Sequence, residues 1–133
     1  KGWKQADLGI VLVYSGEAEE ALQYLKWAKD IDPYFDPPWY WRQAGQTYFI
    51  LRRFEDALSM FQHIPVRTFR IAAYVAACHA QLGNDAGAQA AARECLALQP
   101  GFSVGRHMLK EPYKRPADAG FLADSLRLAG LPE

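Results

Sequence analysis

A pattern of small and large residues recurs three times in the first hundred residues, and it limits the possible folds more than any other feature. The copies contain Gly9, Gly45 and Ala76, which stand 36 and 31 residues apart. Recurrence at this spacing is typical of arrays in which short units of about 34 residues stack on one another. One such unit cannot bury its own apolar face, so we expect neighbouring copies to pack together.

The residues around these small positions have helical periodicity. Apolar side chains recur at intervals of three and four residues, as in amphipathic helices. Nothing shows the alternation of a strand bounded by turn signals. The sequence therefore predicts an all-α chain of antiparallel hairpins. Two helices are expected between residues 8 and 31, separated at Ser15–Gly16, and further helices at residues 39–51, 54–63, 68–82, 85–98, 103–109 and 117–128.

These copies resemble the tetratricopeptide repeat (TPR) family, whose pattern is W-x2-L-G-x2-Y, then A-x3-F and P. The second copy reads Trp41-x-x-Ala44-Gly45-x-x-Tyr48, followed by Ala57 and Phe61. The resemblance implies a TPR-type helical hairpin solenoid, wound as a right-handed superhelix. Its repeats would span residues 2–35, 38–68 and 69–102, with Pro65 shortening the second helix of repeat 2. Residues 103–133 would form a helical tail that caps the last repeat.

The resemblance also implies a binding surface, because the concave groove of a TPR array is lined by the first helix of each repeat. The groove positions are Trp3, Ile10 and Val13 in repeat 1, Trp39, Arg42, Gln46 and Phe49 in repeat 2, and Arg70 in repeat 3, with Ala6, Ala73, Ala77 and Ala80 between them. Trp39 and Phe49 flanking Arg42 would anchor a peptide or helix. Two alternatives stay open. A protein or peptide partner occupies the groove, or upstream repeats or the chain's own tail fill it.

The carboxylate clamp of chaperone-binding TPR domains is absent. Its asparagine positions hold Ile10 and Gln43, and its first lysine position holds Ala6. We therefore do not expect a co-chaperone that captures a C-terminal aspartate.

The chain from residue 76 onward is similar to the TPR tails of bacterial class III adenylate/guanylate cyclase-like proteins. The similar segments are residues 76–83, 98–103, 112–118 and 128–133. This implies a regulatory region, cut from a longer protein, that acts on an upstream cyclase (a phosphorus–oxygen lyase) by binding a partner or by self-association. Two alternatives remain, the TPR arm of a transcriptional regulator and a purely architectural dimerisation unit.

Composition and charge exclude several other classes. The 133 residues carry 15 basic and 15 acidic side chains, and zero net charge argues against broad binding of nucleic acid. No run approaches the ~20 apolar residues of a membrane-spanning helix. Two cysteines 17 residues apart, without metal-ligand spacing, do not form a disulfide framework and indicate a reducing, cytoplasmic setting. Cys78 and His79 are expected to be buried structural residues.

No chemical motif stands out from the repeats. The phosphate-binding, dinucleotide, zinc-protease and nucleophile-elbow signatures are all missing. Cys78 and His79 are adjacent, but neighbours on a helix point about 100° apart and do not form a thiolate pair. We therefore expect a non-catalytic chain without a cofactor or a metal.

Overall fold

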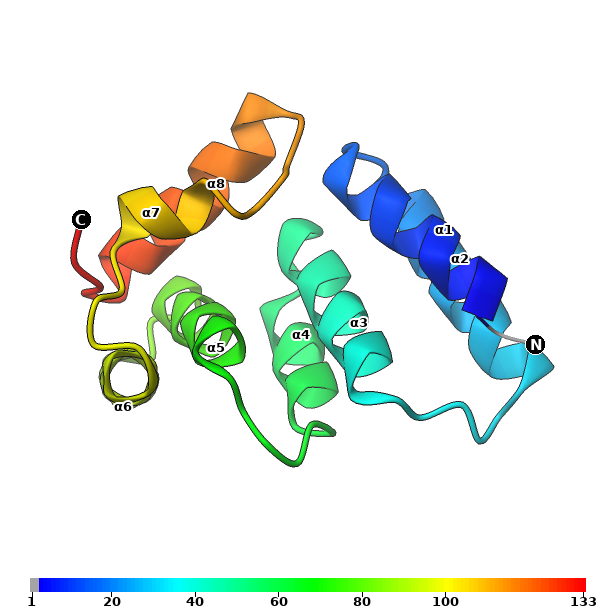
Figure 1. Ribbon diagram of the computed structural model, residues 1–133, viewed down its shortest axis with the longest axis horizontal. Coiled ribbons are helices and arrows are strands. Elements are labelled where there is room, and N and C mark those ends of the chain that lie inside the picture. The colour runs from blue at the N-terminus through cyan, green and yellow to red at the C-terminus, as the bar shows by residue number, and fades with distance from the viewer. Residues whose placement is uncertain (1–2) are drawn as a thin grey trace. The chain divides into compact units, whose positions relative to one another are not determined.

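The computed structural model describes the backbone of residues 3–133 and the side chains from Leu8 onward. Within this part the chain is helical and contains no strand, so the all-α prediction is confirmed (Figure 1). The helices are α1 (Trp3–Tyr14), α2 (Ala18–Ile31), α3 (Pro38–Ile50), α4 (Phe54–Phe61), α5 (Phe69–Gln81), α6 (Asp85–Leu98), α7 (Val104–Met108) and α8 (Pro116–Leu128). The sequence prediction differs mainly at α1, which begins five residues earlier than expected, and at α4, which ends two residues earlier than expected.

The helices group into two compact units. Unit 1 contains the chain up to Pro65 together with the short segment Tyr113–Arg115. Unit 2 contains Val66–Pro112 and Pro116–Glu133. The chain thus leaves unit 2 after Pro112, contributes three residues to unit 1, and returns at Pro116.

Unit 1 consists of the hairpins α1–α2 and α3–α4, with α3 packed on both α1 and α2. Glycine allows the helices of each hairpin to approach closely. A Cβ atom built on Gly9 would lie 3.4 Å from Leu25 Cγ, and one on Gly45 would lie 2.5 Å from the ring of Phe61. The second distance is shorter than any normal carbon–carbon contact, so only glycine fits at position 45 as the helices stand. A small cluster of buried residues, Leu25, Ala28, Phe35, Tyr40 and Ala44, completes this part of the core.

The three hairpins share one turn geometry. Gly16, Arg52 and Gly83 each follow the first helix of a hairpin and have φ of 90°, 64° and 76°. After each of them the chain closes a six-residue turn typical of helix C-termini. The N–H groups of Glu17, Arg53 and Asn84 donate to the carbonyls of Leu12, Tyr48 and His79 at 2.8, 2.9 and 2.9 Å. These turns are 36 and 31 residues apart, the same spacings as the small residues of the repeated pattern.

Unit 2 is built on the hairpin α5–α6. Helix α8 packs on α5, and α7 packs on α8. The end of the chain returns to α7, where Val104 N–H donates to the carbonyl of Pro132 at 2.7 Å. Ser103 caps α7 by accepting from Arg106 N–H at 3.2 Å. The tail therefore covers α5 with the helix α8, and its last residues are hydrogen-bonded to the start of α7.

Replacing Gly45 with alanine tests the close approach of α3 and α4. The new methyl group would collide with Phe61, and overpacking of this kind costs about 1–3 kcal/mol. We expect Gly45→Ala to lower the free energy of unfolding by that amount in urea denaturation. Gly120→Ala is the matched control, because a Cβ there meets nothing within 4 Å inside α8. It should leave stability unchanged or raise it by up to ~1 kcal/mol. Equal losses in both variants would contradict the packing argument.

Candidate functional site

The structure distributes the predicted groove residues between the core and the surface. Val13, Gln46 and Phe49 are fully buried, so an incoming partner cannot reach them in this conformation. Four predicted groove positions are partly exposed, namely Ile10, Trp39, Arg42 and Arg70. The three alanines of repeat 3, Ala73, Ala77 and Ala80, are buried. Trp3 and Ala6 lie outside the described side chains. A binding role for these positions stays a prediction, and only the partly exposed ones are accessible to it.

Trp39 and Phe49 do not form the two sides of an open pocket. The ring of Trp39 packs edge-on against Phe35, with centroids 5.5 Å apart. Phe49 instead packs against Phe54 at 5.7 Å and has no exposed surface. The proposed aromatic anchor around Arg42 is therefore reduced to Trp39.

An extended segment of the chain's own tail occupies part of unit 1. Tyr113 is 8% exposed, and its hydroxyl accepts a hydrogen bond of 3.0 Å from the side-chain amide of Gln46 on α3. Its ring lies 4.7 Å from that of Tyr14 at the end of α1. We call the residues that receive this segment, Tyr14, Gly16 and Gln46, the Tyr113 site.

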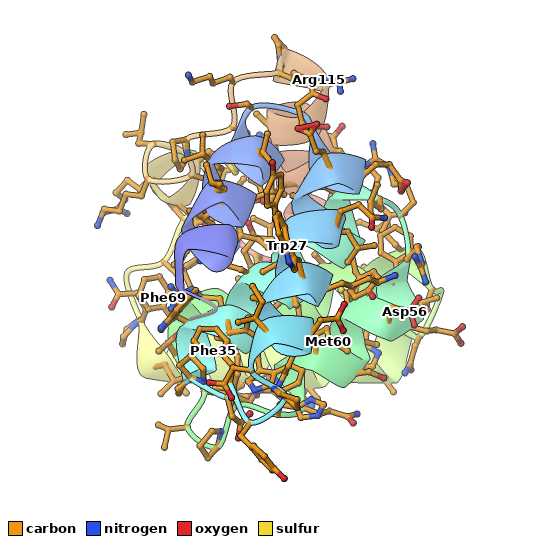
Figure 2. The ribbon with its side chains drawn as sticks, turned by 90° about the vertical axis from the view of Figure 1, so that its right-hand side faces the viewer. Trp27, Phe35, Asp56, Met60, Phe69 and Arg115 are labelled. Atoms are coloured by element: carbon orange, nitrogen blue, oxygen red, sulfur yellow. The ribbon has the colours of Figure 1, made fainter. Side chains whose placement is uncertain are left out.

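Main-chain groups hold the rest of the segment. Lys114 N–H donates to the carbonyl of Tyr14 at 2.9 Å. The Arg115 guanidinium, labelled in Figure 2, donates to the carbonyl of Gly16 at 3.0 Å. Tyr14 is the last residue of α1 and Gly16 lies two residues beyond it, near the end of the helix where the dipole carries partial negative charge and favours cations. A Cβ on Gly16 would lie 1.9 Å from Arg115 Cδ, so the arginine stem rests where only glycine leaves room.

A second polar cluster lies in unit 2 around Glu111. Its carboxylate has no exposed surface and receives two hydrogen bonds from Arg70, at 2.9 and 3.1 Å. The hydroxyl of Tyr74 donates a third at 3.1 Å. His107 Nε2 lies 3.1 Å from the same carboxylate, within ion-pair distance but outside hydrogen-bond geometry. Arg70, which the sequence placed in a groove, is thus engaged in fastening the tail to α5.

The groups around Glu111 lower the pKa of its carboxyl and so keep it ionised. Burial raises the pKa of the carboxyl, but His107 and Arg70 lower it by more, and the net result is a pKa of about 2. The group is therefore ionised at neutral pH and binds its partners as a carboxylate. These charged and hydrogen-bonding partners also fix the position of the tail on α5.

Beside this cluster is an apolar cavity of about 160 Å³. Phe69, Phe102 and His107 line it, with their ring centroids 5.1 to 6.4 Å apart. Arg106 and Lys110 are also among its lining residues. The cavity could accept an apolar group of moderate size.

Both cysteines are free and buried, as was expected for Cys78. His79, which was also expected to be buried, is partly exposed. Burial raises the pKa of Cys78 to about 12, and burial together with Glu94 raises that of Cys95 to about 11. Both are therefore thiols at neutral pH, and the thiolate is the reactive form. Neither is positioned as a nucleophile.

Comparison with known proteins leaves the family open. A scan against protein-family models gave no match, and a search of curated proteins gave none either. No helix in the described part of the chain is long and apolar enough to cross a membrane. Among the described side chains, no three His, Cys, Asp or Glu residues are grouped so that they could hold a metal ion.

Sequence reasoning missed Tyr113 and Glu111, which lie in a stretch it treated as a helix end and a linker. Neither belongs to a repeated pattern, and their partners are 37 to 99 residues away in sequence. The one available signal was composition. Tyr113 is a large aromatic residue in a short, proline-bounded segment, where an unburied ring would be unfavourable.

Acid unfolding tests the Glu111 cluster. The carboxyl has a pKa of about 2 in the fold and about 4.5 without its partners, so its ionised form stabilises the fold above pH 4.5. That contribution, about 3 kcal/mol, is lost as the pH falls from 4.5 towards 2. We expect Glu111→Gln to be less stable than the wild type at pH 7, with the difference shrinking at pH 3. Urea unfolding at both pH values measures this.

Asp124→Asn is the control for that experiment. Its carboxylate is 76% exposed and pairs with Arg127 on the surface, so its removal should change stability by less than ~1 kcal/mol. A loss for Glu111→Gln that stays the same at pH 7 and pH 3 would show that the carboxylate's charge is not what stabilises the tail.

Proposed function

We propose that this chain is a non-catalytic helical-repeat module of the TPR type that binds extended segments of protein partners. The hairpins support the repeat assignment, because their turns share one geometry at the spacing of the repeated pattern. The small residues of that pattern allow paired helices to approach closely, and the helices do so at Gly9 and Gly45.

One observation carries the binding proposal, the extended segment Tyr113–Arg115 received by unit 1. The receiving residues come from α1, the turn after it, and α3, which are the first helices of the two hairpins in that unit. First helices are the elements that the TPR resemblance assigns to partner binding. The receiving surface offers the Tyr14 ring, the Gln46 amide and two main-chain carbonyls. A surface that binds one extended segment through such groups is suited to bind another.

The cellular setting of this module stays a prediction. Regulation of an upstream adenylate or guanylate cyclase rests on the resemblance of the tail, and so does a cytoplasmic, signalling role. A homodimer is the alternative to a peptide receptor.

Selection of peptides from a random display library tests the binding proposal. We expect enrichment of a common sequence that binds the chain with a dissociation constant in the micromolar range. Arg42→Ala on α3 should weaken this binding by about tenfold, since Arg42 is a partly exposed groove position. Arg93→Ala, exposed on α6, is the control and should bind as the wild type does.

Light scattering distinguishes a peptide receptor from the alternative, a homodimer, by measuring the molar mass in solution. A chain that selects no peptide and is dimeric at micromolar concentration would contradict the receptor proposal and favour an architectural dimerisation unit.

A further inference from the structure

The way in which Tyr113 and Arg115 are held specifies the chemistry of a ligand. The phenol ring is buried against Tyr14, and its hydroxyl reaches an amide that has no exposed surface. A phenylalanine would fill the same volume but would leave the Gln46 amide without an acceptor. An unpaired buried donor costs about 1–3 kcal/mol, so the contact selects tyrosine.

The second feature that the surface recognises is a cation two residues after the tyrosine. The Arg115 guanidinium meets the Gly16 carbonyl just past the C-terminal end of α1. This end of a helix favours positive charge. The first 36 residues, which contain Tyr14 and Gly16, carry four basic and seven acidic groups and add a field of the same sign.

The third feature is the extended backbone between these two side chains. The Lys114 N–H pairs with the Tyr14 carbonyl, while the Lys114 side chain is exposed. The middle residue is therefore held through its main chain and can be of any type with an N–H group. Proline is excluded there because it lacks that donor.

The surface also has capacity that the tail does not use. Gln46 Oε1 is buried and accepts no hydrogen bond within the described part of the chain. A ligand that supplies one more donor near the tyrosine would satisfy it. The tail therefore leaves one hydrogen-bond acceptor of this surface, Gln46 Oε1, for a tighter-binding ligand to use.

We propose that the Tyr113 site is a recognition site for extended peptides with the sequence Tyr-x-Arg or Tyr-x-Lys, and that the tail segment Tyr113–Arg115 is a built-in ligand which a partner must displace. This rests on the proposed function and names the class of partner. The tail is tethered, so it competes at an effective concentration in the millimolar range. Binding of a partner in trans is accordingly weak until the tail is released.

Releasing the tail tests the proposal. Lys114→Pro removes the N–H that pairs with Tyr14 but keeps Tyr113, whereas Lys114→Ala keeps the N–H and serves as the matched control. The probe is the peptide acetyl-Pro-Tyr-Lys-Arg-Pro-amide, titrated into the full ¹⁵N-labelled chain. We expect Lys114→Pro to bind it at least tenfold more tightly than the wild type and Lys114→Ala. The side-chain amide of Gln46 and the N–H of Gly16 should shift on binding.

Two altered peptides test the recognition chemistry without changing the protein. Replacing the tyrosine with phenylalanine, or the arginine with alanine, should each weaken binding to Lys114→Pro by about fivefold or more. Gln46→Leu in the Lys114→Pro background should remove the preference for tyrosine over phenylalanine. Tyr113→Ala provides a second way to release the tail if Lys114→Pro does not fold.

The proposal is overturned if folded, tail-released chain binds the probe no better than the wild type, or if the peptide shifts signals elsewhere in the chain without shifting those of Gln46 and Gly16. It is also overturned if all three peptides bind equally. In each case, peptides selected from the display library could still bind, and the broader assignment as a protein-binding module would stand without this specificity.

Discussion

Close approach of paired helices is the constraint on which the rest of the structure depends. At position 45 a single added methyl group would lie 2.5 Å from the ring of Phe61, and at position 9 contact with Leu25 is already tight. Helices this close leave little room for side chains between them, so larger residues project from the hairpin and pack on the next element. The turns at Gly16, Arg52 and Gly83 recur at the same spacing as the small residues of the repeated pattern.

The tail adds a second set of constraints, and these are polar. Glu111 is bound by Arg70, Tyr74 and His107 in unit 2, and two residues later Tyr113 is bound by Gln46 in unit 1. Charged and amide groups without exposed surface need partners of defined position, so they specify where a segment lies more strictly than apolar contacts do. These polar contacts therefore fix the position of the short segment around Tyr113, which lies between two prolines and outside any helix.

Much of the fold could be predicted from the sequence. Periodicity located the ends of α2 to α8 to within about two residues, because the 3.6-residue repeat and the glycine and proline signals act locally. Helix α1 begins five residues before its expected start. The candidate site could be predicted only in part. Gln46, predicted to line a groove, is buried and donates a hydrogen bond to Tyr113 of the chain's own tail. Val13 and Phe49 are also buried, and Arg70 pairs with Glu111. A binding role for these positions stays a prediction. These outcomes depend on residues far away in sequence, which periodicity does not detect.

The sequence by itself determined an all-α chain, the position of each helix, the repeated pattern of small residues, and the absence of familiar catalytic motifs. Tertiary structure alone decided that the tail enters unit 1 through Tyr113 and is fastened in unit 2 through Glu111. The physical reason is the range of the interactions. Helix formation depends on residues three and four apart, whereas a phenol finds its amide, and a carboxylate its guanidinium, only after the chain has folded.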